Sequence, residues 1–343
     1  MSQPNPKPAS RAMVIGVVVF YLVAALAMVM ANKWVLNTST TPLFFLQTQL
    51  AIAVILFLIS DAMRFLPDRL TLDPKVCKGL VPMVGLNVIG LSFTNYTLKY
   101  VDASFYQVAR GMVLPFTVVT SYFVLHHRPS LRIISACAVV TAGFFVGVFL
   151  DGTKVSMVGI SFGVMSSAIT AIHSVVIKQS LNVVNGSALL LSWYTNLLST
   201  FVLVPVIFLA GEVPDIMTLF FAPSTTATDN VLSVFLWGSA ITGALGFLMS
   251  IASLLSIKVT SPITHMVSSA VRGVAASMLG VWLFHDVITS GRASSIAIIL
   301  GGSILYTWIK HQESQPAPGS KDYERVPAED LELGNRKPDT KPE

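Results

Sequence analysis

The chain has 343 residues, of which 53% are hydrophobic and only 11% are charged, and its mean hydropathy is strongly positive. A soluble domain carries about 25% charged residues, so the composition excludes an ordinary soluble enzyme and indicates a membrane protein. The net charge of +5 is divided between +8 on residues 1–310 and −3 on residues 311–343. A basic membrane body suits an anionic substrate or anionic lipid headgroups.

In chain order, a polar, Pro-rich tail at residues 1–12 is followed by ten apolar runs. Each run is long enough to cross a hydrocarbon core of about 30 Å at about 1.5 Å per residue. The runs lie at 13–31, 43–60, 79–97, 103–125, 131–150, 155–177, 188–210, 231–255, 262–284 and 292–309. The membrane body is therefore expected at 13–310. Residues 311–343 mix Pro, Lys, Asp and Glu, and we expect them to form a disordered tail.

The loop lysines and arginines predict the orientation, because cytosolic loops carry an excess of them. With residues 1–12 in the cytosol, eleven basic residues fall on the cytosolic side and four on the opposite side. The four are Lys33, Lys99, Lys154 and Arg292. Both termini are therefore expected to face the cytosol.

An internal repeat is visible at a shift of 158 residues. The matching pairs are Val101 and Val259, Leu125 and Leu283, and Gly143 and Gly301. Five spans separate the two copies, and because five is odd the second copy is inverted in the membrane. We therefore expect an all-α membrane protein with ten transmembrane helices as two inverted five-helix repeats, at about 13–150 and 155–310. Inverted repeats are typical of transporters with a site near the bilayer midplane.

Two arginines lie inside apolar runs, Arg110 in the fourth and Arg272 in the ninth. Each lies about 10–15 Å along its helix from the nearer end. An intramembrane arginine costs about 2.5–3.5 kcal/mol on insertion scales and needs a partner or a wet cavity. No run contains Asp or Glu, which leaves snorkelling, carbonyl ligation or an external anion. The depth of both residues and the fit of a guanidinium fork to phosphate favour an anion site.

Polar and aromatic residues in the later runs are further candidates. Ser268 and Ser269 lie four and three residues before Arg272, and His265 lies in the same ninth run. Tyr194 and Asn196 belong to an aromatic-polar cluster in the seventh run. Aromatic rings stack on nucleobases and asparagine binds their edges. Small residues at helix contacts and interfacial aromatic belts are the structural alternatives.

Three segments resemble GDP-fucose transporters. They are 99–110, with Phe105-Tyr106 and Arg110; 257–265, followed by Ser268 and Arg272; and Gly301-Gly302-Ser303 with Tyr306-Thr307-Trp308. The resemblance covers nearly the whole membrane body. It implies membership of the nucleotide-sugar and triose-phosphate carriers in the drug/metabolite transporter superfamily. These are ten-helix antiporters of the Golgi, endoplasmic reticulum or plastid that exchange a nucleotide sugar for the nucleoside monophosphate.

The resemblance also implies roles for individual residues. The guanine-binding Phe-Tyr-Asn-Asn motif of GDP-sugar carriers corresponds to Trp193-Tyr194-Thr195-Asn196, with two positions changed. In the ninth-span motif, Ser269 replaces glycine and Arg272 replaces the lysine near the phosphates. A third-span Phe-Asn-Asn pattern corresponds to Phe93-Thr94-Asn95. These departures leave the base open between guanine and uracil.

Together these features predict a nucleotide-sugar:nucleoside-monophosphate antiporter of the Golgi membrane, GDP-fucose-like and not an enzyme. A UDP-sugar transporter is the close alternative, an endoplasmic reticulum location stays open, and a triose-phosphate exchanger or a membrane scaffold is less favoured. We expect no cofactor, metal or nucleic acid. The expected partners are the exchanged nucleotides and lipid, and a homodimer is left open.

The predicted site has two parts. The substrate-binding residues are Arg110 and Arg272 for the diphosphate, with Tyr194, Asn196, His265, Ser268, Ser269, Tyr106 and Asn95 around them. The residues that attract the anion or form gates are Lys99 and Lys258.

Overall fold

The computed structural model describes residues 11–126, 128–150, 156–221, 226–259 and 262–314, without the side chains of 11–14, 125, 178, 226–229, 251–259 and 262–270. The described residues form helices and connecting turns, with no β-strand among them. The helices are α1 (Arg11–Thr38), α2 (Pro42–Ala62), α3 (Pro74–Tyr100), α4 (Ala103–Gly111), α5 (Val113–Leu125), α6 (Leu131–Phe149), α7 (Met157–Val183), α8 (Ala188–Leu209), α9 (Val213–Phe221), α10 (Thr226–Val259), α11 (Pro262–Phe284) and α12 (Ser290–Ser314).

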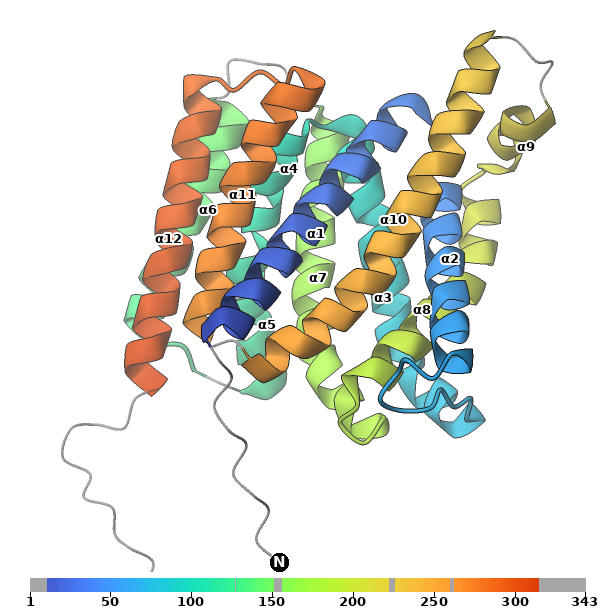
Figure 1. The fold of residues 1–343 in the computed structure, drawn as a ribbon. Helices are drawn as coiled ribbons and strands as arrows, with labels where there is room; N and C mark the ends of the chain where they lie inside the picture. The colour runs from blue at the N-terminus through green and yellow to red at the C-terminus, as the bar shows by residue number, and fades with distance from the viewer. Residues whose placement is uncertain (1–10, 127, 151–155, 222–225, 260–261, 315–343) are drawn as a thin grey trace, which may run out of the picture.

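The helices pack side by side in one bundle, with α2 and α8 at one edge and α6 and α12 at the other (Figure 1). Among the described residues, eight helices are long and apolar enough to cross a membrane: α1, α2, α3, α6, α7, α8, α10 and α12. The prediction of an all-α membrane protein is confirmed. The first residues of α1 and the last residues of α12 lie at the same end of the bundle (Figure 1).

The fourth predicted run is divided into two helices at Met112. Pro115 has no N–H, and its ring clashes with the carbonyl four residues earlier, that of Gly111, in a continuous helix. The Met112 N–H instead donates to the Ala109 carbonyl at 3.2 Å, a tighter three-residue turn. Arg110 therefore lies in the last turn of α4 rather than in the middle of a long helix.

Glycines allow α6 and α12 to approach closely. A Cβ atom added at Gly147 would lie 2.6 Å from Ser295 Oγ, and one at Gly302 would lie 2.7 Å from Val140 Cγ2. The Ser295 hydroxyl donates to the Gly143 carbonyl at 2.6 Å, which joins the two helices. This contact places α12 against the helices that carry the cavity, because α12 also packs on α4.

Charged side chains join the helices at the end of the bundle where α3 ends and α4 begins. Lys33 Nζ on α1 donates to the Leu98 carbonyl at 2.8 Å and to the Val101 carbonyl at 2.7 Å. On α12, Arg292 Nη1 donates to Asp102 Oδ2 and Ser104 Oγ, both at 2.9 Å. Arg292 is only 1% exposed, whereas the Asp102 side chain is 47% exposed, so this end of the bundle holds a buried cation paired with a half-exposed carboxylate.

Beside it, Glu212 ties the segment between α8 and α9 to two other helices. Its carboxylate accepts the Leu43 N–H at 3.0 Å and the Phe44 N–H at 3.0 Å, and the Tyr96 hydroxyl at 3.1 Å. These N–H groups belong to the first turn of α2, which has no intrahelical acceptors for them. Burial raises the pKa of the Glu212 carboxyl.

Candidate functional site

A cavity of about 300 Å³ lies inside the bundle, at the lower end of the range for small-molecule sites. Side chains from α1, α3, α4, α5, α7, α10 and α11 line it. Apolar residues such as Met28, Leu86 and Leu91 alternate with amides and hydroxyls along its walls. Among the described lining residues there is no aspartate or glutamate.

Arg110 and Arg272 both line this cavity. The Arg110 guanidinium donates from Nη1 to the Tyr106 hydroxyl at 3.1 Å and remains accessible from the cavity. Arg272 is joined to Tyr21 on α1 by a side-chain hydrogen bond. Two cations from α4 and α11 thus share one cavity, and each is oriented by a tyrosine. Phosphate oxygens are the natural ligands of such a pair of guanidinium groups.

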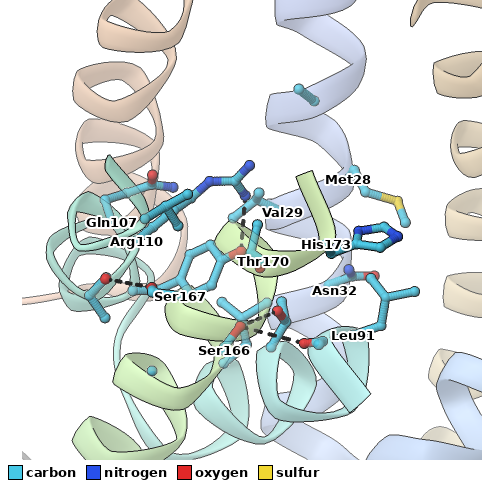
Figure 2. Close-up of a pocket in the computed structure, with 18 of the residues that line it drawn as sticks. Met28, Val29, Asn32, Leu91, Gln107, Arg110, Ser166, Ser167, Thr170 and His173 are labelled. Carbon is cyan, nitrogen blue, oxygen red and sulfur yellow. Dashed lines mark hydrogen bonds between the residues drawn. The ribbon is translucent and has the colours of Figure 1, made fainter. Parts of the chain in front are cut away.

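The cavity has amide, hydroxyl and imidazole groups on the wall formed by α1, α3 and α7. Figure 2 shows Asn32 and His173 on the side of the cavity away from Arg110 and Gln107. Gln49 Nε2 on α2 donates to Asn32 Oδ1 at 3.0 Å. Asn87 Nδ2 on α3 donates to Ser199 Oγ on α8 at 3.0 Å. The cavity therefore has a cationic side and a neutral polar side.

Some residues predicted for the site lie elsewhere. The Tyr194 side chain is 1% exposed, and its hydroxyl accepts the Asp73 N–H at 2.9 Å, next to the N-terminus of α3. Asn196 Nδ2 donates to the Ser192 carbonyl of its own helix at 2.8 Å. Asn95 is 3% exposed, and its Oδ1 atom has no hydrogen-bond partner in the described chain. None of these three lines the cavity.

The other predicted residues divide into described and undescribed side chains. Tyr106 lines the cavity with Arg110. Lys99 Nζ lies at the end of α3 and donates to the Thr40 carbonyl at 3.0 Å. The remaining predicted side chains lie outside the described residues: Lys258, His265, Ser268 and Ser269. Within the described part of the chain, no group of three or more His, Cys, Asp or Glu side chains could hold a metal ion.

Sequence reasoning missed the neutral polar wall, although helical spacing could have found it. The cavity face of α1 follows the pattern i, i+4, i+7, i+11 from Tyr21 to Asn32, and α3 repeats it from Asn87 to Leu98. Asn95 is one residue beyond Thr94 and therefore points about 100° away from the cavity face. Counting polar residues along the Arg-facing stripes would have selected Asn87 instead of Asn95.

Apolar helices packed around a cationic cavity whose described lining has no carboxylate are the features of a multi-pass membrane transporter for an anion. Residues 12–307 match the model of the Triose-phosphate Transporter family, and the chain belongs to this family. The prediction of a nucleotide-sugar and triose-phosphate carrier family is thereby confirmed.

Three GDP-fucose transporters align with this chain over most of its length. GDP-fucose transporter 1 of Monosiga brevicollis is 31% identical, over 91% of this chain and 93% of the relative. The Golgi GDP-fucose transporter of Drosophila melanogaster is 31% identical over 87% and 90%, and GDP-fucose transporter 1 of Mus musculus is 30% identical over 92% and 89%. A crystal structure that is 14% identical shares the fold, with a TM-score of 0.53 over 89% of this chain and 100% of that one.

Proposed function

We propose that this protein is a nucleotide-sugar:nucleoside-monophosphate antiporter of the Golgi membrane that carries GDP-fucose or a similar GDP-sugar from the cytosol to the lumen. The observation that carries the proposal is the convergence of Arg110 and Arg272 on one cavity, in which the described residues include no carboxylate. The names of the relatives support the sugar nucleotide, and all three are transporters rather than enzymes.

The proposed topology has ten crossings in two inverted repeats, with both termini in the cytosol. In this arrangement the pair α4 and α5 forms the fourth crossing and α11 the ninth, in addition to the eight long apolar helices. Residues 1–12 and 311–343 would be cytosolic tails, although α12 continues to Ser314. The α1 start and the α12 end at one face of the bundle support an even number of crossings.

The proposed mechanism follows from the charge of the cavity. Moving the charges of Arg110 and Arg272 past a low-dielectric barrier is costly. A bound diphosphate or monophosphate would neutralise them, so the occupied carrier changes access more readily than the empty one. Arg110, held by Tyr106, and Arg272 would bind the phosphates. His265, Ser268 and Ser269 remain proposed contacts because they precede Arg272 on α11, and Lys99 and Lys258 remain proposed gate residues.

Exchange in reconstituted liposomes tests the proposal. Liposomes preloaded with GMP should take up labelled GDP-fucose, and empty liposomes should take up very little. Equal uptake by empty and preloaded liposomes, or uptake that follows an imposed proton gradient, would rule out the exchange mechanism. Uptake driven better by internal UMP than by GMP would keep the mechanism and reassign the substrate to the UDP-sugars, which the altered Trp193-Tyr194-Thr195-Asn196 motif leaves open.

A further inference from the structure

Two asparagines of the cavity are each hydrogen-bonded to a residue behind them. Asn32 Oδ1 accepts from Gln49 Nε2, and Asn87 Nδ2 donates to Ser199 Oγ. Gln49 is 4% exposed and Ser199 is fully buried, and neither lines the cavity. Each asparagine thus has one amide atom engaged by a buried neighbour.

Both asparagines line the cavity, and the other amide atom of each is left for a ligand. Asn32 Nδ2 and Asn87 Oδ1 have no hydrogen-bond partner among the described residues, and neither is sealed from the cavity as the Asn95 oxygen is. The wall therefore presents one oriented donor from α1 and one oriented acceptor from α3. The cavity side chains of Met28, Leu86 and Leu91 provide apolar surface on the same helices.

We propose that Asn32 and Asn87 recognise the edge of the nucleobase, with Gln49 and Ser199 as positioning residues that hold the two amides in place. The inference rests on the proposed function and names the part of the cavity that reads the base.

The chemistry of the groups favours a base over the sugar. A sugar hydroxyl rotates and can either donate or accept, so an amide that binds it gains little from a fixed orientation. A nucleobase edge has donors and acceptors at fixed positions, and amide side chains match such edges when they are correctly oriented. The flat faces of a base also suit the neighbouring apolar side chains, while the phosphates reach Arg110 and Arg272. Four residues arranged to fix two amides are therefore explained by a base.

A matched pair of substitutions tests the polarity of the two amides. Asn87→Asp keeps an acceptor oxygen toward the ligand, whereas Asn32→Asp replaces the donor with a second acceptor. Both variants add the same negative charge to the same cavity, so their difference reports hydrogen bonding rather than charge. We expect Asn32→Asp to weaken inhibition of labelled GMP exchange by unlabelled GMP at least about tenfold more than Asn87→Asp, the size expected for an unpaired buried acceptor.

The positioning residues are tested by base selectivity. Gln49→Leu and Ser199→Ala should reduce the preference for the favoured base, measured as the ratio of exchange driven by the preferred nucleoside monophosphate to exchange driven by the other, at least about threefold, because a freed amide accepts either edge. Inhibition by pyrophosphate and by ribose 5-phosphate, which have no base, should stay within about twofold of wild type in Gln49→Leu and Ser199→Ala, which add no charge. Ile172→Ala on α7, at an exposed position outside the cavity, is the control for a change in a spanning helix.

The results separate this inference from the proposed function. If the wild-type protein exchanges no nucleotide at all, the proposed function fails. If the wild type exchanges nucleotides while the variants keep its base selectivity, or if they lose only sugar-nucleotide uptake and keep GMP-for-GMP exchange, the base assignment is wrong. A variant that loses pyrophosphate inhibition together with its melting transition is misfolded. In that case the comparison of Asn32→Asp with Asn87→Asp decides whether the two asparagines bind the base.

Discussion

Removing Arg272 should abolish transport without damaging the fold. A hydrogen bond to a charged group contributes about 1.5–3 kcal/mol, and a guanidinium can offer two to one phosphate. Because Arg272 is also bonded to Tyr21, we assume only one strong phosphate contact plus its charge, about 3 kcal/mol. At about 1.4 kcal/mol per factor of ten, Arg272→Ala should lower exchange at subsaturating substrate at least about 100-fold.

Arg272→Lys should lose less, about tenfold, because lysine supplies the charge but lacks the planar fork. The assay is GMP-driven uptake of labelled GDP-fucose into liposomes, with protein content and melting temperature measured on each variant. Arg132→Ala, which removes an exposed arginine at the start of α6, is the matched control and should transport normally.

Stability gives an independent check. Arg110 and Arg272 repel each other in the same cavity, so Arg272→Ala should not lower the melting temperature of the ligand-free protein. Wild-type exchange by Arg272→Ala would refute the phosphate site. Loss of exchange accompanied by an equal loss of folded protein would show that Arg272 is structural.

Three further predictions concern the rest of the molecule. Arg292→Met should destabilise the protein by about 2–3 kcal/mol, seen as a lower melting temperature, because two charge-assisted bonds are lost while the half-exposed Asp102 is rehydrated; an unchanged melting temperature would contradict this. The folded-state pKa of Glu212 is raised by burial, so its contribution to stability is full below the unfolded pKa and is lost as the pH rises through the folded pKa. Wild type should therefore lose more stability than Glu212→Gln as the pH rises above the ordinary carboxyl pKa of about 4, and parallel curves would count against it. A glycosylation acceptor engineered near Asn185 should stay unmodified, whereas one extended from the Asn37 loop should be glycosylated. Glycosylation near Asn185 would show that the topology is the reverse of the proposed one.

The membrane architecture was predictable because an apolar run is recognised from its composition alone, without knowing which way each side chain points. All ten runs fall on helices, with the fourth divided between two. Arg110 and Arg272 could be selected as candidates for a similar reason. The runs contain no Asp or Glu, so an external anion or water is needed for these arginines however each helix is rotated.

The neutral half of the site depends on rotation and on neighbours, which one sequence does not give. Tyr194 shares a motif position with the family, yet its ring lies near the end of α8 and its hydroxyl meets Asp73. Asn32 and its anchor are 17 residues apart and lie on different helices, and Asn87 is 112 residues from Ser199. Only packing brings these pairs together. Pro115 predicts the helix break at Met112, but hydropathy alone shows one continuous apolar run from 103 to 125.

The division between α4 and α5 also bears on how the protein is made. A single segment 103–125 with an arginine at its centre and a proline-induced break would enter the bilayer poorly alone, since the arginine costs about 2.5–3.5 kcal/mol and a broken helix leaves carbonyls unpaired. Arg110, however, lies in the last turn of α4, where the partial negative charge of a helix C-terminus favours a cation. Arg110 and the break thus offset each other, and the cavity formed with α1, α3 and α7 supplies water and further hydrogen bonds. During synthesis α1 and α3 are available before this segment and α7 only after it, so the fourth crossing should settle fully only when the chain beyond α6 has been inserted.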